Sequence, residues 1–338
     1  MEIGEVIDKM NPLQIPVIFL GEDSNLGARL GALYQEIIWG NEYRIAPFYL
    51  ATLPKFWVES IPKKGPALVF VEISASKNQG TGLAEQANLI RDICNSNGSV
   101  QIALLAEDDA DYFAIAETFH IGNVLKKKAF DAAVLRALTI RLMTGNIFGF
   151  DPYFPNGYTV GPLYRTFVGE VVVEDAIEDC VKACLPYVNA NEASSFKIFL
   201  NELLLNTFSY SIQGITPEDR DAKLLQAPPI VQIAERRGIK VSLVADAEKV
   251  GVSVQDSTGN LSMLRVMQKL RRQSRIGGEK MPPGIWDESG RGISMVYRYS
   301  RFIVNILKGV RTEIIFLHYH KEELNRFESI IITEVQPF

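Results

Sequence analysis

The sequence predicts an α/β protein with two domains, a doubly wound parallel sheet followed by an α+β sandwich. In the first half, continuous apolar strands alternate with amphipathic helices, a pattern typical of a parallel sheet covered on both faces. A segment rich in Pro, Gly and aromatic residues follows at 146–163 and predicts a domain boundary. Beyond it, helices and paired strands cluster, which indicates an α+β sandwich. The 338 residues are enough for two such domains, which we expect at 1–145 and 164–338.

The elements expected in the first domain are five apolar strands and the helices between them. Each strand is short and apolar, and each helix shows helical periodicity. The strands are expected at 16–22, 43–51, 67–74, 100–107 and 123–128, and the helices at 25–40, 80–98, 109–122 and 130–145. Five such strands predict a doubly wound sheet of the (βα)5 type.

The elements expected in the second domain follow a different order. It begins with a strand at 165–173 and continues with helices at 174–188 and 192–212. Two hairpins are expected at 238–259 and 301–320, the second turning near Lys308 and Gly309. Between the hairpins we expect a basic helix at 264–275 and another helix that begins within 290–300.

Composition excludes several classes of function. The net charge of −5 argues against a protein that binds nucleic acid through phosphate contacts. No apolar run is long enough to span a membrane, and the first residues do not resemble a signal peptide. Three cysteines are too few for a disulfide framework, so Cys94, Cys180 and Cys184 are interpreted as reduced core residues of a cytoplasmic protein.

The stretch NELLLN places two polar side chains, Glu202 and Asn206, four residues apart in an otherwise apolar helix. Residues with this spacing lie on one face of a helix. An amide oxygen can hold Mg²⁺, which takes few protein ligands, and a carboxylate one turn away can accept a proton from a hydroxyl. The alternative is an exposed polar stripe on an amphipathic helix.

Two further motifs point toward nucleotide chemistry. Asp256 ends a predicted strand and Gly259 follows it, so a carboxylate could accept a hydrogen bond from an exocyclic amine beside a backbone without a side chain. Gly290 and Gly292 precede a predicted helix, whose free backbone N–H groups would suit a phosphate. The alternatives are an ordinary Asp/Gly turn and a simple N-terminal turn.

Together, in this order, the three motifs resemble the GHKL-type ATP-binding domain shared by gyrase, histidine kinases and MutL, across about residues 166–320. ELLLN is similar to its first box, DSTG to its second and GRG, with Arg291 between the glycines, to its third. Thr312 corresponds to the threonine that lies beneath the adenine in that family. The resemblance implies a Bergerat-type fold that binds ATP and Mg²⁺. The resemblance also places QKLRRQSR where the family has its mobile lid. Arg271, Arg272 and Arg275 could then neutralise phosphate charge. The alternative is that they form a solvated helix face.

Glu202 directs the resemblance toward one branch, the anti-sigma-factor serine kinases, because histidine kinases usually carry an amide there. None of His120, His318 and His320 is placed as a phosphoacceptor. The resemblance implies that Glu202 is the general base for a serine or threonine of an anti-sigma antagonist or sigma-factor-like partner, that Asn206 holds Mg²⁺, and that Asp256 and Gly259 recognise adenine. Related kinases often dimerise, so a homodimer is a further hypothesis. A non-catalytic partner-switching module and an atypical histidine kinase fragment remain alternatives.

The first domain resembles the receiver domains of two-component response regulators, across about residues 14–145. A working receiver carries an acidic pair after strand one, an Asp ending strand three, a Ser or Thr ending strand four and a Lys ending strand five. The corresponding residues here are Glu22 and Asp23, Glu72, Leu105 or Ala106, and Lys127 or Lys128. Glutamate in place of the phosphoacceptor, and no hydroxyl, imply a pseudo-receiver used for docking or dimerisation. An unusual active receiver or an unrelated doubly wound module is the alternative, with the acidic residues as a solvated rim.

Overall fold

The computed structural model describes most of the chain, and the described part has a mixed α/β fold. The described residues are 15–39, 48–51, 61, 65–73, 81–107, 112–128, 130–190, 193–208, 229–274, 301–321 and 329–337. The chain divides into two compact units, the first formed by Met1–Ile147 and Asp151–Pro155 and the second by Phe148–Phe150 and Asn156–Phe338. Residues of the predicted linker are thus divided between the units.

The first unit contains a five-stranded parallel sheet, as the apolar runs predicted. Its order is β2-β1-β3-β4-β5, a common order of doubly wound folds. The central strands are buried on both faces, which explains their continuous apolar sequences. The bounds are β1 Val17–Leu20, β2 Phe48–Ala51, β3 Ala67–Ile73, β4 Val100–Ala106 and β5 Asn123–Lys126.

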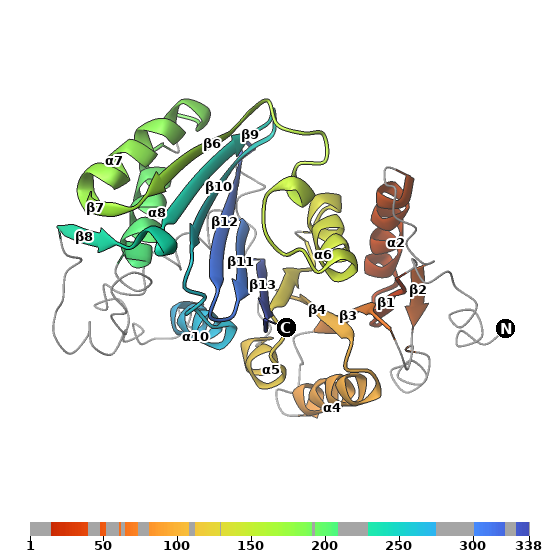
Figure 1. Cartoon of the computed structure of the whole chain (residues 1–338). Coiled ribbons are helices and arrows are strands. Elements are labelled where there is room, and N and C mark those ends of the chain that lie inside the picture. The colour runs from red at the N-terminus through yellow and green to blue at the C-terminus, as the bar shows by residue number, and fades with distance from the viewer. Residues whose placement is uncertain are drawn as a thin grey trace, which may run out of the picture. The chain divides into compact units, whose positions relative to one another are not determined.

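Helices cover both faces of this sheet (Figure 1). Helices α2 (Ser24–Trp39) and α6 (Ala132–Thr144) lie on one face, where the hydroxyl groups of Tyr34 and Thr139 are hydrogen-bonded at 3.2 Å. Helices α4 (Thr81–Ser96) and α5 (Tyr112–Phe119) lie on the other. A short 3-10 helix, η1 (Asp151–Tyr153), contacts α6.

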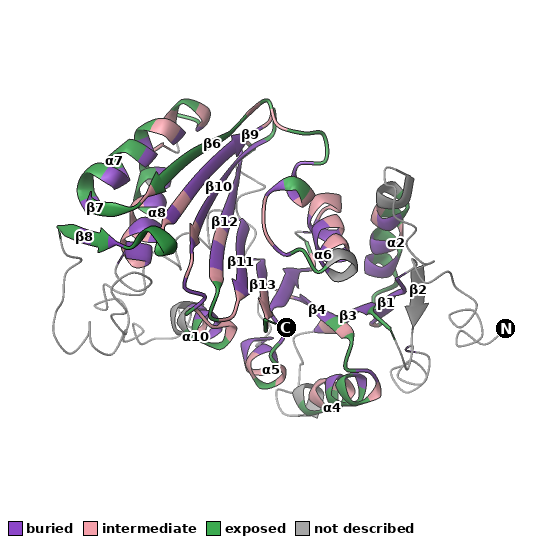
Figure 2. Cartoon of the chain, in the orientation of Figure 1, coloured by how far each residue is buried: buried purple, intermediate pink, exposed green. Residues whose placement is uncertain are grey.

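The second unit is built on a mainly antiparallel sheet whose order is β13-β11-β12-β10-β9-β6. Among its described strands, β13 is the one that pairs in parallel, beside β11. The inner strands are almost entirely buried (Figure 2). The bounds are β6 Val160–Phe167, β9 Ile239–Ala245, β10 Lys249–Asp256, β11 Arg301–Leu307, β12 Arg311–Tyr319 and β13 Ile330–Val335.

Three helices and a small ribbon complete the described part of the second unit. Helices α7 (Val173–Cys184) and α8 (Ala193–Asn206) pack on each other, and α10 is Met263–Ser274. The ribbon pairs β7 (Gly169–Val172) with β8 (Ile230–Ile233). Two 3-10 helices, η2 (Leu185–Tyr187) and η4 (Glu235–Arg237), lie between these elements.

Several sequence predictions need correction. The strand predicted at 165–173 is divided between two strands, because the chain leaves one sheet after β6 and enters the ribbon as β7, turning at Gly169 with a φ of 73°. Strands β8 and β13 were not predicted. Both hairpins are confirmed, and the second turns at Gly309 with a φ of 71°. The helix expected to begin within 290–300 lies outside the described residues. So does the part beyond residue 208 of the helix expected at 192–212.

The cysteines fit their expected environment only in part. All three are free thiols, but Cys94 is exposed, so its assignment to the core was wrong. Cys180 and Cys184 are buried on α7, and burial raises the pKa of the Cys180 thiol to about 12 and that of Cys184 still further. Among the described helices, none has both the length and the apolar character to cross a bilayer.

Candidate functional site

Helix α8 covers one face of the second sheet and sets the geometry of the candidate site. Its Phe196 ring lies 5.3 Å from the ring of Phe316 and 5.9 Å from that of His318, both on β12. Alternate residues of a strand share a face, so Thr312, four residues before Phe316, faces the same side as α8. Asp256 pairs with Thr312 across the strands and therefore faces α8 as well.

The two polar residues of α8 stand beside a buried apolar stripe. Leu203 and Leu204 are 2% and 0% exposed, whereas Glu202 and Asn206 are partly exposed. Burial of the leucines holds the helix against its neighbours and leaves the two polar side chains at the margin of the packed face. The structure thus places Glu202 and Asn206 on the helix that covers the face bearing Asp256 and Thr312.

Asp256 and Thr312 form a buried polar pair of residues at one end of the sheet. They are 6% and 2% exposed. Oδ1 of Asp256 accepts hydrogen bonds from the backbone nitrogen of Thr258 at 2.8 Å and from its hydroxyl at 2.5 Å. The Thr312 hydroxyl, in contrast, has no hydrogen-bond partner among the described residues. Such a buried group needs a partner, which a ligand or an ordered water can supply.

Gly259 has a structural role that the sequence did not reveal. Its φ is 58°, and its carbonyl accepts a hydrogen bond at 3.1 Å from the backbone nitrogen of Gly309 in the β11–β12 turn. A Cβ atom on Gly259 would lie 2.6 Å from the backbone nitrogens of Gly309 and Val310. Close packing against this turn therefore requires glycine, and recognition of adenine by Gly259 stays a prediction.

The remaining residues predicted for nucleotide binding are placed only in part. The basic segment forms α10, which begins where Glu334 accepts a hydrogen bond at 2.8 Å from the backbone nitrogen of Met263. Arg271 lies on this helix and is partly buried. The side chain of Arg272, and all of Arg275, Gly290, Arg291 and Gly292, lie outside the described residues.

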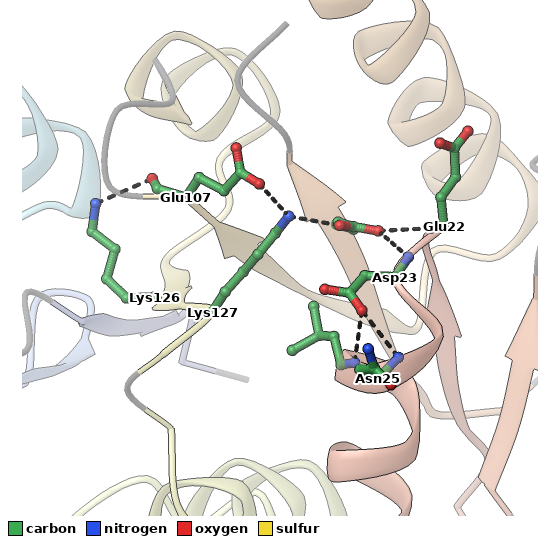
Figure 3. Close-up of polar contacts among 8 residues, drawn as sticks. Glu22, Asp23, Asn25, Glu107, Lys126 and Lys127 are labelled. Carbon is green, nitrogen blue, oxygen red and sulfur yellow. Dashed lines mark hydrogen bonds and ion pairs between the residues drawn. The ribbon is translucent and has the colours of Figure 1, made fainter.

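In the first unit, Glu72 is the centre of an internal network of charges and hydrogen bonds. Figure 3 labels its partners Glu22, Asp23 and Lys127. One oxygen, Oε2, accepts hydrogen bonds from the backbone nitrogens of Glu22 at 2.7 Å and Asp23 at 3.1 Å. The other, Oε1, lies 2.6 Å from Nζ of Lys127. The carboxylate that stands where a phosphoacceptor is expected is therefore engaged at both oxygens.

Lys127 is shared between two carboxylates, since its Nζ also lies 3.0 Å from Oε1 of Glu107. The side chains of Lys127 and Glu72 are 13% and 8% exposed, whereas that of Glu107 is 41% exposed. Partial burial opposes the charge of Lys127, but hydrogen bonds and charge attraction from Glu72 and Glu107 outweigh it and raise the pKa of Lys127. Lys127 thus keeps its charge throughout the neutral pH range.

The side chains of the other residues of the predicted receiver-like pocket have different environments. Asp23 caps the start of α2, accepting hydrogen bonds at 3.0 Å from the backbone nitrogens of Asn25 and Leu26. The Glu22 side chain points away from the cluster (Figure 3). Lys128 is exposed and lines a pocket of about 500 Å³ together with Asp23, Asn25, Leu26, Arg29, Ala106, Glu107 and Lys127.

Two residues that contact the candidate site residues, Glu107 and Thr258, were not predicted from the sequence. Glu107 follows β4 directly, at the edge of the sheet where polar groups of such folds collect. This position could have identified Glu107 as a candidate site residue. Thr258 lies two residues after Asp256, the spacing of a turn closed by an aspartate side chain. Both are recognisable once the ends of the strands are known.

Replacing Glu72 with glutamine should lower the free energy of unfolding of the first unit by about 1–3 kcal/mol, because a largely buried charged partner of Lys127 is lost. Glu107→Gln is the matched control, since Glu107 contacts the same ammonium but is far more exposed. It should cost about 0–1 kcal/mol. Denaturant unfolding of both variants measures the difference, and equal losses would contradict a central role for Glu72.

No protein-family model matches the chain, and no curated protein matches its sequence.

Proposed function

We propose that the chain binds ATP and Mg²⁺ through its second unit and transfers phosphate to a serine or threonine of a protein partner of the anti-sigma-antagonist type. The observation that carries this proposal is the buried Thr312 hydroxyl. It lacks a hydrogen-bond partner among the described residues and stands directly opposite Asp256, on the sheet face that bears α8. The proposal includes a Bergerat-type arrangement for this unit.

The chemistry of the described residues supports these roles. The Asp256 carboxylate is mostly buried, and it can accept a hydrogen bond from an exocyclic amine while Oδ1 still holds Thr258. Thr312 can donate or accept beside it. Asn206 offers an amide oxygen to Mg²⁺, which would supply charge neutralisation at the phosphates. Glu202, one turn away on the same partly exposed stripe, can accept the proton of an attacking hydroxyl.

The first unit is proposed to be a pseudo-receiver that serves in docking or dimerisation. Both oxygens of Glu72 are engaged by groups of the protein itself, and Leu105 and Ala106 at the end of β4 carry no hydroxyl. A carboxylate that already holds three donors is a poor acceptor for a phosphoryl group. The surface of this unit would then not change by phosphorylation of Glu72.

Calorimetry with ATP and ADP, in Mg²⁺ and then in excess chelator, tests nucleotide binding. We expect binding that weakens when Mg²⁺ is removed, and a loss of about 10- to 100-fold in affinity in Asp256→Asn, since a hydrogen bond to a charged group is lost. The asparagine amide in this variant would keep an oxygen for Thr258, so the turn should survive. Absence of any binding by the unaltered chain would reject the proposal.

Labelled ATP with a candidate partner then separates the catalytic alternatives. Acid-stable phosphate on serine or threonine supports the kinase. Binding without transfer supports a non-catalytic partner-switching module, and acid-labile phosphohistidine supports an atypical histidine kinase.

A further inference from the structure

The face of the second sheet that points away from α8 carries a buried polar cluster. Strand alternation puts Glu313 on this face, because its neighbour Thr312 points toward α8. Asn305 pairs with Glu313 across the strands, and Ser253 lies diagonally opposite on β10. Glu313, Asn305 and Ser253 are 4%, 0% and 2% exposed.

The Glu313 carboxylate binds three donors, one of which comes from a distant part of the chain. Oε1 accepts from the Ser253 hydroxyl at 2.8 Å, and Oε2 accepts from Nδ2 of Asn305 at 3.0 Å. Oε2 also accepts from the backbone nitrogen of Gly149 at 2.9 Å, across 164 positions of sequence. A buried carboxylate is costly unless it is hydrogen-bonded, so each donor matters to it.

The segment Phe148–Phe150 has a second attachment to the same strand. The guanidinium carbon of Arg311 lies 3.6 Å from the centre of the Phe148 ring, a cation–π contact. Arg311 stands two residues before Glu313 and so shares its face. Gly149, whose amide makes the first attachment, has a φ of 91°, a conformation that favours glycine. These contacts explain why Phe148–Phe150 groups with the second unit although its flanking residues group with the first.

We propose that Phe148–Phe150 is a strap clamped by Glu313, and that the strap and the candidate nucleotide site are coupled through β12. Thr312 and Glu313 are consecutive, and their side chains project from opposite faces of a strand that is paired on both sides. A ligand that displaces Thr312 therefore displaces Glu313 and the Gly149 hydrogen bond. This coupling rests on the proposed function, whereas the clamp is independent of it.

Two glycine variants test the coupling. Gly149 and Gly157 both have a positive φ, at 91° and 80°, and a Cβ at either position meets open space, so their backbone strain is matched. We expect Gly149→Ala to change the Kd for ATP with Mg²⁺ by about fivefold or more and Gly157→Ala to leave it nearly unchanged. Hydrogen exchange should show that ATP alters the exchange rate of the Gly149 amide in the unaltered chain.

The outcomes distinguish this inference from the proposed function. If the unaltered chain binds ATP but the two variants have the same Kd and exchange at Gly149 does not respond, the coupling is overturned. If the unaltered chain binds no ATP, the proposed function fails and the coupling with it. Glu313→Gln, which keeps the side-chain volume, tests the clamp alone: faster exchange at Gly149 than in the unaltered chain supports it, and equal exchange refutes it.

Discussion

Replacing Glu202 with glutamine should reduce the proposed phosphate transfer to a serine partner by about 100- to 10,000-fold, the usual contribution of a general base. Glutamine has the same shape, but its amide does not accept a proton. Glu202 is only partly buried, and the adjacent Leu203 and Leu204 anchor the helix, so the variant should fold normally. The affinity for ATP should stay within about twofold, because a base contributes to the transition state more than to ground-state binding.

Initial rates with labelled ATP, together with calorimetry, measure both quantities. Glu178→Gln on the adjacent helix α7 is the control, since it also removes one carboxylate from this helical layer but only breaks an exposed pair with Lys182. Transfer by the control should remain near that of the unaltered chain. Undiminished transfer by Glu202→Gln would show that the proton is accepted elsewhere.

Substitution of Gly259 by alanine should destabilise the second unit by about 2–4 kcal/mol, through a strained backbone and a collision with the β11–β12 turn. The collision arises because a Cβ would stand 2.6 Å from the backbone nitrogens of Gly309 and Val310. Backbone atoms within a turn have little room to move away.

Gly309→Ala separates the two contributions. Gly309 also has a positive φ, 71°, but a Cβ there would meet open space. It should cost about 1–2 kcal/mol, the backbone part alone. Denaturant unfolding of both variants is the measurement. Equal losses of unfolding free energy would mean that the β11–β12 turn moves to make room for the Cβ of Gly259→Ala. Weak nucleotide binding by Gly259→Ala would therefore not, by itself, demonstrate contact with adenine.

Local pattern was sufficient for most of the architecture. The five parallel strands and the two hairpins follow from apolar runs and turn residues that lie close together in the sequence. Strand β13 was not predicted, although the β-branched run Ile330–Thr333 is a local signal for a strand. Its parallel pairing with β11 has no adjacent turn and could not be predicted from the sequence. The strand expected at 165–173 is extended as predicted but consists of two strands, and only their different partners separate β6 from β7.

For the candidate site, the sequence alone was enough to identify the residue types and their spacing. Glu202 stands four residues before Asn206, Asp256 stands three before Gly259, and Glu72 lies at the end of an apolar strand. The three-dimensional packing was needed to show that Asp256 pairs with Thr312 across the strands and that a neighbouring turn requires Gly259. It was also needed to show that groups far along the chain bind Glu72 and Glu313. Spacing along a helix or strand is set by backbone geometry, which the local sequence encodes. The partner of a buried carboxylate is set instead by packing, which brings distant donors together to offset the cost of burying charge.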